Sequence, residues 1–511
     1  MLTRALVRRA ELALRRSVTL ADLMAQLAEV HGSATFVTEE LAPGRVRTLS
    51  YLDAARQVER WSVAVAARSA PGRPVVVATP NGIDQFLVCL AVSRAGGLPA
   101  PVNPQMSEAE VDHVIADSGA TLVIREALEL ESGKGSRSAP MLAAHPDAGD
   151  VGALFYTSGT TGRPKGAELS HRALVGQVAA AAAWPFVLRN DEIVMALPVA
   201  HIMGFVAVMG PALAGIPIYF LDRFSPTRVL DAIEHRRSSA FIGVPTMYRT
   251  LLESGAADRD LTSVRVWISG ADVMPADVAR RFKSFGATAT LPGLGPLGEA
   301  AFVEGYGMVE VGGSVAAKIS PPLLPIGLGD SLGLSMPGWR LKVADAEGRS
   351  VLPGQVGELR LRGPGVLTGY WGDREATDAA ITPDGWLRTG DLVRSGPFGT
   401  VLFQGRAKAV IKSGGYSVYP LEVEADLEEH PDVLEAAVVG LPDDKLGEVP
   451  VAAVRLRPKA KVTGEQLVVW AGVRMAQYKA PRVVVVVDEL PRTGTRKVQR
   501  DRLLPLFDAS R

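Results

Sequence analysis

Apolar runs of strand length alternate with helical patterns between residues 73 and 126. The runs at 74–80, 98–102 and 121–126 are short and rich in β-branched residues, so they predict strands. The segments 83–94 and 107–118 between them predict helices. Strands that are apolar throughout and separated by helices are typical of parallel βαβ units.

The same alternation returns at 240–285, with strands expected at 240–244 and 264–269 and helices at 245–253 and 275–285. Residues 193–221 contain no Asp, Glu, Lys or Arg and exceed the length of a membrane span. Three prolines, several glycines and His201 interrupt this stretch. It therefore favours buried helix and strand of a large α/β core, with a spanning helix as the alternative.

The pattern changes at 341–362, where short alternating strands and turns predict a small antiparallel sheet or barrel. Beyond 406 we expect a compact α+β domain with helices at 421–429 and 464–477 and strands at 436–439, 451–456 and 483–487. A chain of 511 residues is too long for one ordinary core, which predicts at least two domains.

Composition excludes some classes of function. Lys+Arg and Asp+Glu are both 55, so no global charge favours nucleic acid as a partner. Cys89 is the only cysteine, which suits a reducing compartment, and we expect a cytoplasmic protein with a buried, inert thiol. The arginine-rich residues 1–16 lack a secretory pattern and predict a surface helix, with a peripheral membrane contact as the alternative.

The stretch LFYTSGTTGRPKGAELSH, at 154–171, combines small residues, hydroxyls and Lys165. Such a run lets backbone N–H groups approach a polyphosphate closely, and it predicts a phosphate cradle. It is not a Walker loop, because Gly166 follows the lysine. We expect a helix at 174–184 to direct its N-terminal N–H groups at the anion. A flexible linker is the alternative interpretation.

Two further stretches carry candidate chemistry. SGADVMP, at 269–275, leaves a strand and opens a helix, which is where doubly wound sheets bind ligands. EGYGMVE, at 304–310, leaves a tyrosine ring face free for a purine and offers Glu310 to Mg²⁺. Alone, this second stretch is weak evidence, because any exposed turn can contain Gly-Tyr-Gly.

In this order the three stretches resemble the adenylate-forming (AMP-binding) superfamily, and fatty acyl-CoA synthetases most of all. The resemblance extends to LPVAHIMGF, DGWLRTGDLV, GRAKAVIKSGGYSVYPLEVE and ELPRTGTRKVQR, and so to nearly the whole chain. It implies an α/β fold whose large N-terminal domain has stacked, mostly parallel sheets and a small β-barrel-like subdomain. A small mobile α+β domain follows, with the boundary at 1–406 and 407–511.

The resemblance also implies roles for single residues. Those matching ATP-binding positions are Thr157, Ser158, Gly159, Thr160, Thr161, Gly162, Lys165, Gly270, Ala271, Gly305, Tyr306, Gly307, Asp391 and Arg406. Glu310 and Thr160 match the Mg²⁺ site. Lys497, His201 and Glu310 match catalytic positions. Lys412, Gly414, Gly415 and Tyr416 match the channel for the thiol acceptor.

The implied reaction has two halves. The acid attacks the α-phosphate of ATP to give an acyl-adenylate and pyrophosphate, with Lys497 bridging the two reactants. The small domain then turns about a hinge, withdraws Lys497 and admits the thiol of coenzyme A or of a carrier-protein phosphopantetheine, which displaces AMP. The two acceptors present the same thiol arm, so the sequence does not separate them.

The acid substrate is inferred from LPVAHIMGF. His201 matches the histidine at the entrance to the acyl pocket, and Ala200 stands where many relatives carry an aromatic residue. We expect a roomy apolar pocket lined by residues such as Phe205 and Val244. No Arg or Lys is present in that stretch to pair a second carboxylate, so a medium- or long-chain fatty acid is the hypothesis. A satisfied core histidine is the alternative for His201.

Three positions depart from the family pattern: Val309 replaces the usual threonine before the metal ligand, Ala409 replaces an acidic hinge residue, and Arg496 replaces a glycine. These three departures leave open the alternative that the protein is a nucleotide-binding regulator that has lost turnover. A fatty acyl-AMP ligase that loads an acyl carrier protein and a luciferase-like oxygenase are also compatible with the motifs. A homodimer is left open as well.

Overall fold

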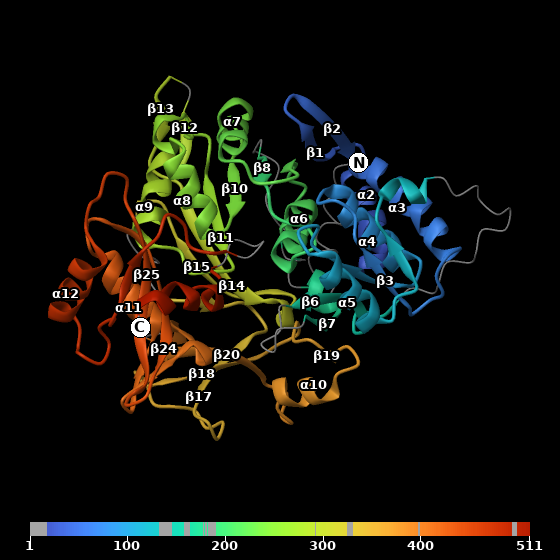
Figure 1. The fold of residues 1–511 in the computed structure, drawn as a ribbon. Coiled ribbons are helices and arrows are strands. Elements are labelled where there is room, and N and C mark those ends of the chain that lie inside the picture. Colours follow the sequence, from blue (N-terminus) through green and yellow to red (C-terminus); the bar gives the residue numbers. More distant parts are fainter. Residues whose placement is uncertain are drawn as a thin grey trace. The chain divides into compact units, whose positions relative to one another are not determined.

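The computed structural model describes residues 18–131, 146–157, 164–176, 178, 181, 191–291, 293–323, 331–396, 399–492 and 498–510. The chain divides into two compact units (Figure 1). Unit 1 comprises Met1–Arg340 and Arg362–Leu387, and unit 2 comprises Leu341–Leu361 and Arg388–Arg511. The predicted boundary after Arg406 therefore stays a prediction.

A mixed sheet dominates unit 1, with nine strands among the described residues in the order β16-β15-β14-β11-β10-β8-β9-β1-β2. The six neighbours β14, β11, β10, β8, β9 and β1 run parallel. The bounds are β1 Thr35–Ala42, β2 Arg45–Ser50, β8 Ile193–Met195, β9 Ile218–Leu221, β10 Ala240–Gly243, β11 Val266–Gly270, β14 Ala301–Met308, β15 Gly313–Ser320 and β16 Leu334–Ser335. Parallel neighbours place their carboxyl ends along one edge of the sheet.

Three helices cover one side of this sheet (Figure 1). They are α7 (Pro226–Arg236), α8 (Pro245–Glu253) and α9 (Ala276–Phe285). The rings of Tyr248, Trp267 and Phe282 pack edge to face between the helices and the strands. The Tyr248 hydroxyl donates to the Ile268 carbonyl at 2.8 Å, so this buried polar group is satisfied.

Helices α4 and α5 pack against a parallel sheet with the strand order β4-β3-β5, and α2 and α3 pack on α4. Phe205 on α6 contacts Phe86 on α4 and Phe155 on β6 (Val151–Thr157), and all three rings are buried. The bounds are α2 Leu20–His31, α3 Tyr51–Ala66, β3 Pro74–Val77, α4 Ile83–Arg94, β4 Leu98–Pro101, α5 Glu108–Ser118, β5 Leu122–Ile124 and α6 Ile202–Ala214. The predicted βαβ order and the buried nature of 193–221 are confirmed.

An antiparallel sheet of order β19-β7-β6 carries the cradle stretch. Strand β6 (Val151–Thr157) and strand β7 (Lys165–Ser170) form a hairpin, and β19 (Gly369–Tyr370) pairs with β7. Strand β7 lies between the cradle and the helix predicted at 174–184, so the role expected for that helix toward the phosphates stays a prediction. A π-helical turn, Arg172–Gly176, comes only after β7, and most of 177–190 lies outside the described residues.

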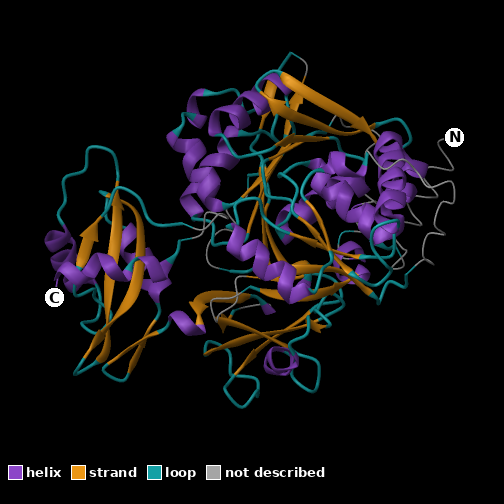
Figure 2. Ribbon diagram, turned by 45° about the vertical axis from the view of Figure 1, so that its right-hand side comes forward, coloured by secondary structure: helices purple, strands orange, loops and turns teal. Residues whose placement is uncertain are grey.

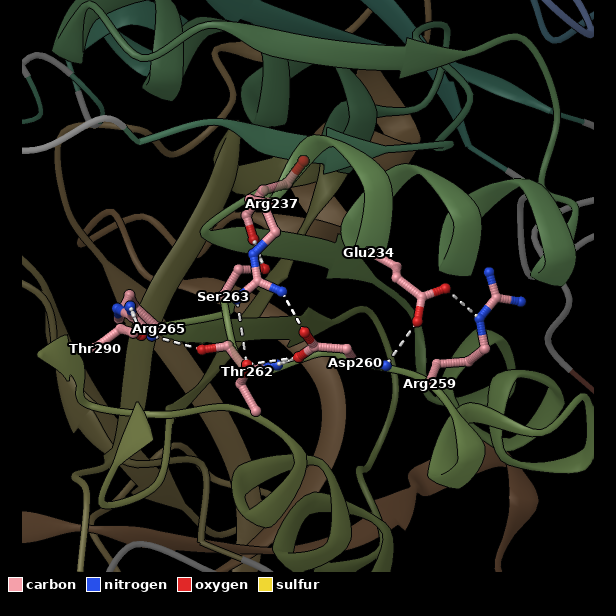
Figure 3. Close-up of polar contacts among 9 residues, drawn as sticks. Glu234, Arg237, Arg259, Asp260, Thr262, Ser263, Arg265 and Thr290 are labelled. Atoms are coloured by element: carbon pink, nitrogen blue, oxygen red, sulfur yellow. Dashed lines mark hydrogen bonds and ion pairs between the residues drawn. The ribbon is translucent and has the colours of Figure 1, made fainter. Parts of the chain in front are cut away.

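A polar network fixes the loop that enters β11 at its amino end (Figure 3). Arg259 pairs with Glu234 at the end of α7, and Glu234 also accepts from the Asp260 N–H at 2.9 Å. Arg265 donates to the Thr262 and Ala287 carbonyls at 2.8 and 3.0 Å. These contacts fix the end of β11 opposite the carboxyl edge, so they serve the fold.

In unit 2, the strands of order β17-β18-β20-β21 form the predicted small antiparallel sheet, which begins with Arg340 and includes Arg362 and Leu387 of unit 1. Helices α11 and α12 lie on one face of a second sheet, β23-β22-β25-β24 with β26 beside β25, and the last residues cover the other (Figure 2). The bounds are β17 Arg340–Ala344, β18 Val356–Arg362, β20 Leu387–Ser395, β21 Val401–Arg406, β22 Ile411–Ser413, β23 Tyr416–Val418, α11 Pro420–Glu428, β24 Val433–Asp443, β25 Gly447–Leu456, α12 Gly464–Arg474 and β26 Val484–Val486.

Within the part of the chain that the structure describes, no helix is both long and apolar enough to cross a membrane. The uncharged stretch at 193–221 is divided between β8, α6 and β9. The alternative of a spanning helix there is therefore wrong.

Candidate active site

The carboxyl edge of the parallel strands brings several predicted site residues together. Gly243 ends β10, Gly270 ends β11, and β14 carries Gly305, Tyr306 and Gly307 at its end. Gly270 pairs with Gly305 across the strands. Ligands bind in open α/β sheets at this edge, because the chain leaves the strands there in turns that expose backbone groups.

The turn after β11 contains a strained residue. Ala271 has φ +69°, a left-handed conformation that alanine rarely adopts and that costs on the order of 1 kcal/mol or more. A Cβ at the preceding Gly270 would lie 3.1 Å from the Gly305 oxygen and 3.4 Å from Cε of Met203 on α6. The turn is thus held in close contact with β14 and with the first turn of α6.

Glycine is required at the end of β14 by close packing against β15. A Cβ at Gly307 would lie only 1.8 Å from the Gly313 carbonyl oxygen. A Cβ at Gly305 would lie 2.8 Å from Oγ of Ser314. Tyr306 stands between these glycines and pairs with Ala316. The EGYGMVE pattern therefore has a packing reason as well as its predicted role toward a purine.

The cradle is the connection of the β6–β7 hairpin. Thr157 and Lys165 face each other across the two strands. Ser158, Gly159, Thr160, Thr161 and Gly162 lie outside the described residues. The structure therefore describes the two ends of the predicted loop, and Lys165 is one of them.

Lys165 and Glu310 lie in one polar network, although 145 positions separate them. The Lys165 ammonium is 3.1 Å from Oδ2 of Asp373, and it lies 5.7 Å from the centre of the Tyr370 ring. The Tyr370 hydroxyl donates to Oε1 of Glu310 at 3.1 Å. The Leu367 N–H donates to the backbone oxygen of Glu310 at 2.8 Å. The two ends of the predicted ATP site are thereby connected.

The electrostatics of this network follow from its contacts. Burial, and then the Glu310 carboxylate, raise the pKa of Tyr370 far above its usual range, so the hydroxyl stays a donor. The Ala376 N–H and Lys165 lower the pKa of Asp373, which also caps α10 (Arg374–Ala380).

The residues predicted for the acid lie around the first turns of α6 and α8. His201 is the N-cap of α6, and its Nδ1 accepts from the Met203 N–H at 3.3 Å. Val244 is the buried N-cap of α8. Phe205 packs wholly among other aromatic rings in the interior. The acyl-binding roles of these three residues stay predictions.

Unit 2 holds two residues that match ATP-binding positions, Asp391 and Arg406. Asp391 on β20 and Arg406 on β21 pair across the strands, with Nε of Arg406 2.6 Å from Oδ1 of Asp391. The aspartate side chain is 2% exposed and the arginine side chain 55% exposed. The arginine thus neutralises a buried carboxylate and keeps an exposed surface of its own.

The predicted channel for the thiol acceptor is the β22–β23 hairpin. Gly414 and Gly415 have φ of +56° and +83°, as a tight two-residue turn requires. Nζ of Lys412 donates to Oγ of Ser417 at 2.7 Å, and the Tyr416 ring stacks on Tyr478. Lys497 lies outside the described residues, and its role stays a prediction.

Sequence reasoning missed Tyr370 and Asp373. They lie in the sequence between β18 and β20, within GYWGD, and about 200 residues separate them from the hairpin that they contact. A Gly-Tyr-Trp-Gly-Asp turn directly before a helix could have drawn attention to them. Nothing local in the sequence shows that β19 pairs with β7.

The donor set at Glu310 fits a magnesium ion. Mg²⁺ is commonly held by one or two carboxylates together with substrate phosphates. Among the described residues, no three His, Cys, Asp or Glu side chains gather into a metal site of their own. Glu310, with one oxygen fixed by Tyr370, would therefore share the ion with a bound triphosphate.

Comparison with known proteins shows the family. Residues 24–371 match the AMP-binding enzyme family, and residues 422–497 match the AMP-binding enzyme C-terminal domain. The chain belongs to the AMP-binding enzymes. It is an AMP-forming acid–thiol ligase of the acyl-CoA synthetase kind, and its activity is that of an ATP-dependent acid–CoA ligase.

Several relatives of different specificity are similar. A feruloyl-CoA synthase from an Amycolatopsis species is 33% identical, over 90% of this chain and 94% of its own. A long-chain-fatty-acid–CoA ligase from Bacillus subtilis is 34% identical, over 70% of this chain and 61% of its own. The structure of o-succinylbenzoate coenzyme A synthetase from Bacillus subtilis with ATP and magnesium is 25% identical, with a TM-score of 0.79 over 94% of this chain and 99% of its own.

Proposed function

We propose that this enzyme activates a medium- or long-chain fatty acid with ATP and Mg²⁺ and then transfers the acyl group to coenzyme A, releasing AMP. The observation that carries the proposal is the network joining Lys165 at the rim of the cradle to Glu310 through Asp373 and Tyr370. A cation and a metal-type carboxylate in one network suit a triphosphate.

In the first half-reaction the chain's residues bind and orient. The cradle holds the β- and γ-phosphates, Lys165 turns its charge toward them, and Tyr306 stacks on the adenine. When bound, Mg²⁺ at Glu310 neutralises phosphate charge. Lys497 places the carboxylate in line with the α-phosphate, so that its oxygen forms the new bond to phosphorus while pyrophosphate leaves with the bonding electrons.

In the second half-reaction the thiol replaces AMP at the acyl carbon. The thiolate attacks the carbonyl, and the bond from the carbonyl carbon to the AMP oxygen breaks. Lys497 is not needed in this geometry, and the Lys412–Tyr416 hairpin lines the approach of the pantetheine arm. Turning of the 407–511 domain about a hinge near Ala409 would separate the two geometries.

The apolar residues near the carboxyl edge of the parallel strands support an acid substrate with an apolar tail. Ala200, Val244 and Met247 are buried there, and Met203 reaches the Gly270 turn. No Arg or Lys lies between 193 and 221 to receive a second carboxylate. A buried, unpaired second carboxylate would be strongly disfavoured, which argues against a dicarboxylic acid.

An aromatic acid is the second candidate substrate, because a feruloyl-CoA synthase and an indoleacetate–CoA ligase are among the similar proteins. A carrier-protein phosphopantetheine remains the second candidate acceptor. The carboxylate activation is the same in every case, and only the pocket and the thiol differ.

Product analysis across acids and acceptors tests the proposal. Purified enzyme is mixed with ATP, Mg²⁺ and coenzyme A, or with a loaded acyl carrier protein, and with fatty acids of increasing length, ferulate, indoleacetate or a dicarboxylic acid. Mass spectrometry should show acyl-CoA and AMP, with the highest rate for medium or long chains. A preference for ferulate would overturn the fatty-acid assignment, and ADP as the product would overturn the whole proposal.

A further inference from the structure

Tyr370 connects the cradle hairpin to the predicted metal ligand. Its backbone lies in β19 and pairs with Ala167 on β7, two residues after Lys165. Its hydroxyl donates to Oε1 of Glu310 at 3.1 Å, and the Lys165 ammonium lies 5.7 Å from the centre of its ring. One side chain thus contacts both charged groups of the proposed triphosphate site.

The hydrogen bond constrains Glu310. A carboxylate on a free side chain can rotate and expose either oxygen, whereas a donor on Oε1 fixes the group and leaves Oε2 to face a cation. Glu310 lies in a short 3-10 turn, Val309–Val311. The backbone oxygen of Glu310 also accepts a hydrogen bond from the Leu367 N–H. Backbone and side chain are therefore both fixed from the segment 367–370.

The next turn of the same segment holds the lysine. Asp373 accepts the Ala376 N–H at 2.8 Å as the cap of α10, and its other oxygen lies 3.1 Å from Nζ of Lys165. Capping fixes the aspartate, and the aspartate in turn fixes the direction of the lysine. The segment 367–376 thus sets the spacing between the cation and the metal ligand.

We propose that Tyr370 is a positioning residue that orients Glu310 toward Mg²⁺ and couples it to the cradle through β19. The proposal rests on the proposed function, because it requires Glu310 to be the metal ligand. Tyr370 transfers no proton and touches no reacting atom in this role.

Tyr370→Phe tests the proposal, because it removes the hydroxyl and keeps the ring against Lys165. Acid-dependent exchange of labelled pyrophosphate into ATP is measured over a range of Mg²⁺ concentrations. A hydrogen bond to a charged group contributes enough to expect about a tenfold or greater rise in the Mg²⁺ concentration for half-maximal rate. The rate at saturating Mg²⁺ should stay within about threefold of the wild type, since a metal in excess compensates for a weaker site.

Tyr219→Phe is the matched control. The Tyr219 hydroxyl also donates to a glutamate, Oε2 of Glu40 at 3.0 Å, but it lies on β9 among structural contacts. Both variants lose one tyrosine-to-carboxylate hydrogen bond, and thermal unfolding measures the loss of stability in each. Only Tyr370→Phe should change the Mg²⁺ dependence. An equal change in both variants, or no change in either, would overturn the positioning role.

A double-mutant cycle separates this inference from the proposed function. In a Glu310→Gln background, Tyr370→Phe should shift the Mg²⁺ dependence by less than about twofold, because the tyrosine acts through the carboxylate. An unchanged Mg²⁺ dependence in Glu310→Gln alone would refute the metal assignment of the proposed function. A clear effect of Glu310→Gln together with none of Tyr370→Phe would refute the positioning role alone.

Discussion

Replacing Gly307 with alanine tests how closely β14 and β15 must approach beside the predicted metal ligand. The new Cβ would lie 1.8 Å from the Gly313 oxygen and 2.6 Å from the Gly313 carbonyl carbon. A carbon and an oxygen rest about 3.3 Å apart even in close contacts between strands. The strands must therefore separate by roughly 1.5 Å, and no side-chain rotation relieves the clash because both atoms are backbone.

This displacement should reach the active site, since Glu310 follows only three residues later. A shift of about 1 Å at a catalytic group can cost about 100-fold in rate, so we expect at least that loss in acid-dependent exchange of pyrophosphate into ATP. Overpacking of this kind should also lower the free energy of unfolding by about 1–3 kcal/mol.

The control is Gly210→Ala in the interior of α6, where the added Cβ meets no heavy atom within 4 Å. Alanine favours the helix there, so this variant should gain about 0.5–1 kcal/mol of stability and keep its activity. Exchange rates and thermal unfolding are measured for both variants. A Gly307→Ala enzyme within about threefold of the wild-type rate would refute the reasoning, because the strand ends would then tolerate separation.

Three further substitutions probe separate parts of the account. Lys497→Ala should reduce adenylate formation by about 100-fold or more yet spare thiolysis of a supplied acyl-adenylate; equal loss in both would contradict its role. Glu310→Gln should raise the Mg²⁺ requirement of exchange, and an unchanged titration would place the metal elsewhere. Burial lowers the pKa of His171 from 6.5 to about 4, and its Nδ1 accepts the Leu20 N–H, so folding favours the neutral ring. The stabilisation that the neutral ring contributes is therefore complete above pH 6.5, and about 3 kcal/mol of it is lost as the pH falls to 4. His171→Asn should remove this part of the pH dependence of the free energy of unfolding, measured with denaturant. Parallel pH curves for the variant and the wild type would contradict the prediction.

Local patterns were sufficient to predict the helices α4, α5, α8, α9, α11 and α12 and several of the strands. The predicted helix at 83–94 is α4, Ile83–Arg94, because a Pro-Asn-Gly turn precedes an apolar run of helical length. The prediction at 245–253 is α8, Pro245–Glu253, since proline at the first position favours a helix start. Such signals lie within a few residues of the element that they define.

The candidate site was predictable only where its residues lie in strand ends and turns. Gly270, Ala271 and Gly305 meet at the sheet edge because parallel order brings carboxyl ends together. Strand β7, after the cradle, was missed because KGAELS has no strong strand pattern. Its pairing partners, β6 and β19, stabilise it. Tyr370 was missed because its partners come from distant parts of the chain.

The most direct test of the proposed chemistry is oxygen transfer from the acid to AMP. A fatty acid carrying ¹⁸O in both carboxylate positions is converted with ATP, Mg²⁺ and coenzyme A, and the phosphate-containing products are analysed by mass spectrometry. If the carboxylate attacks the α-phosphate and the thiol then attacks the acyl carbon, each AMP should carry one ¹⁸O. Label in inorganic phosphate with unlabelled nucleotide would contradict activation through an acyl-adenylate.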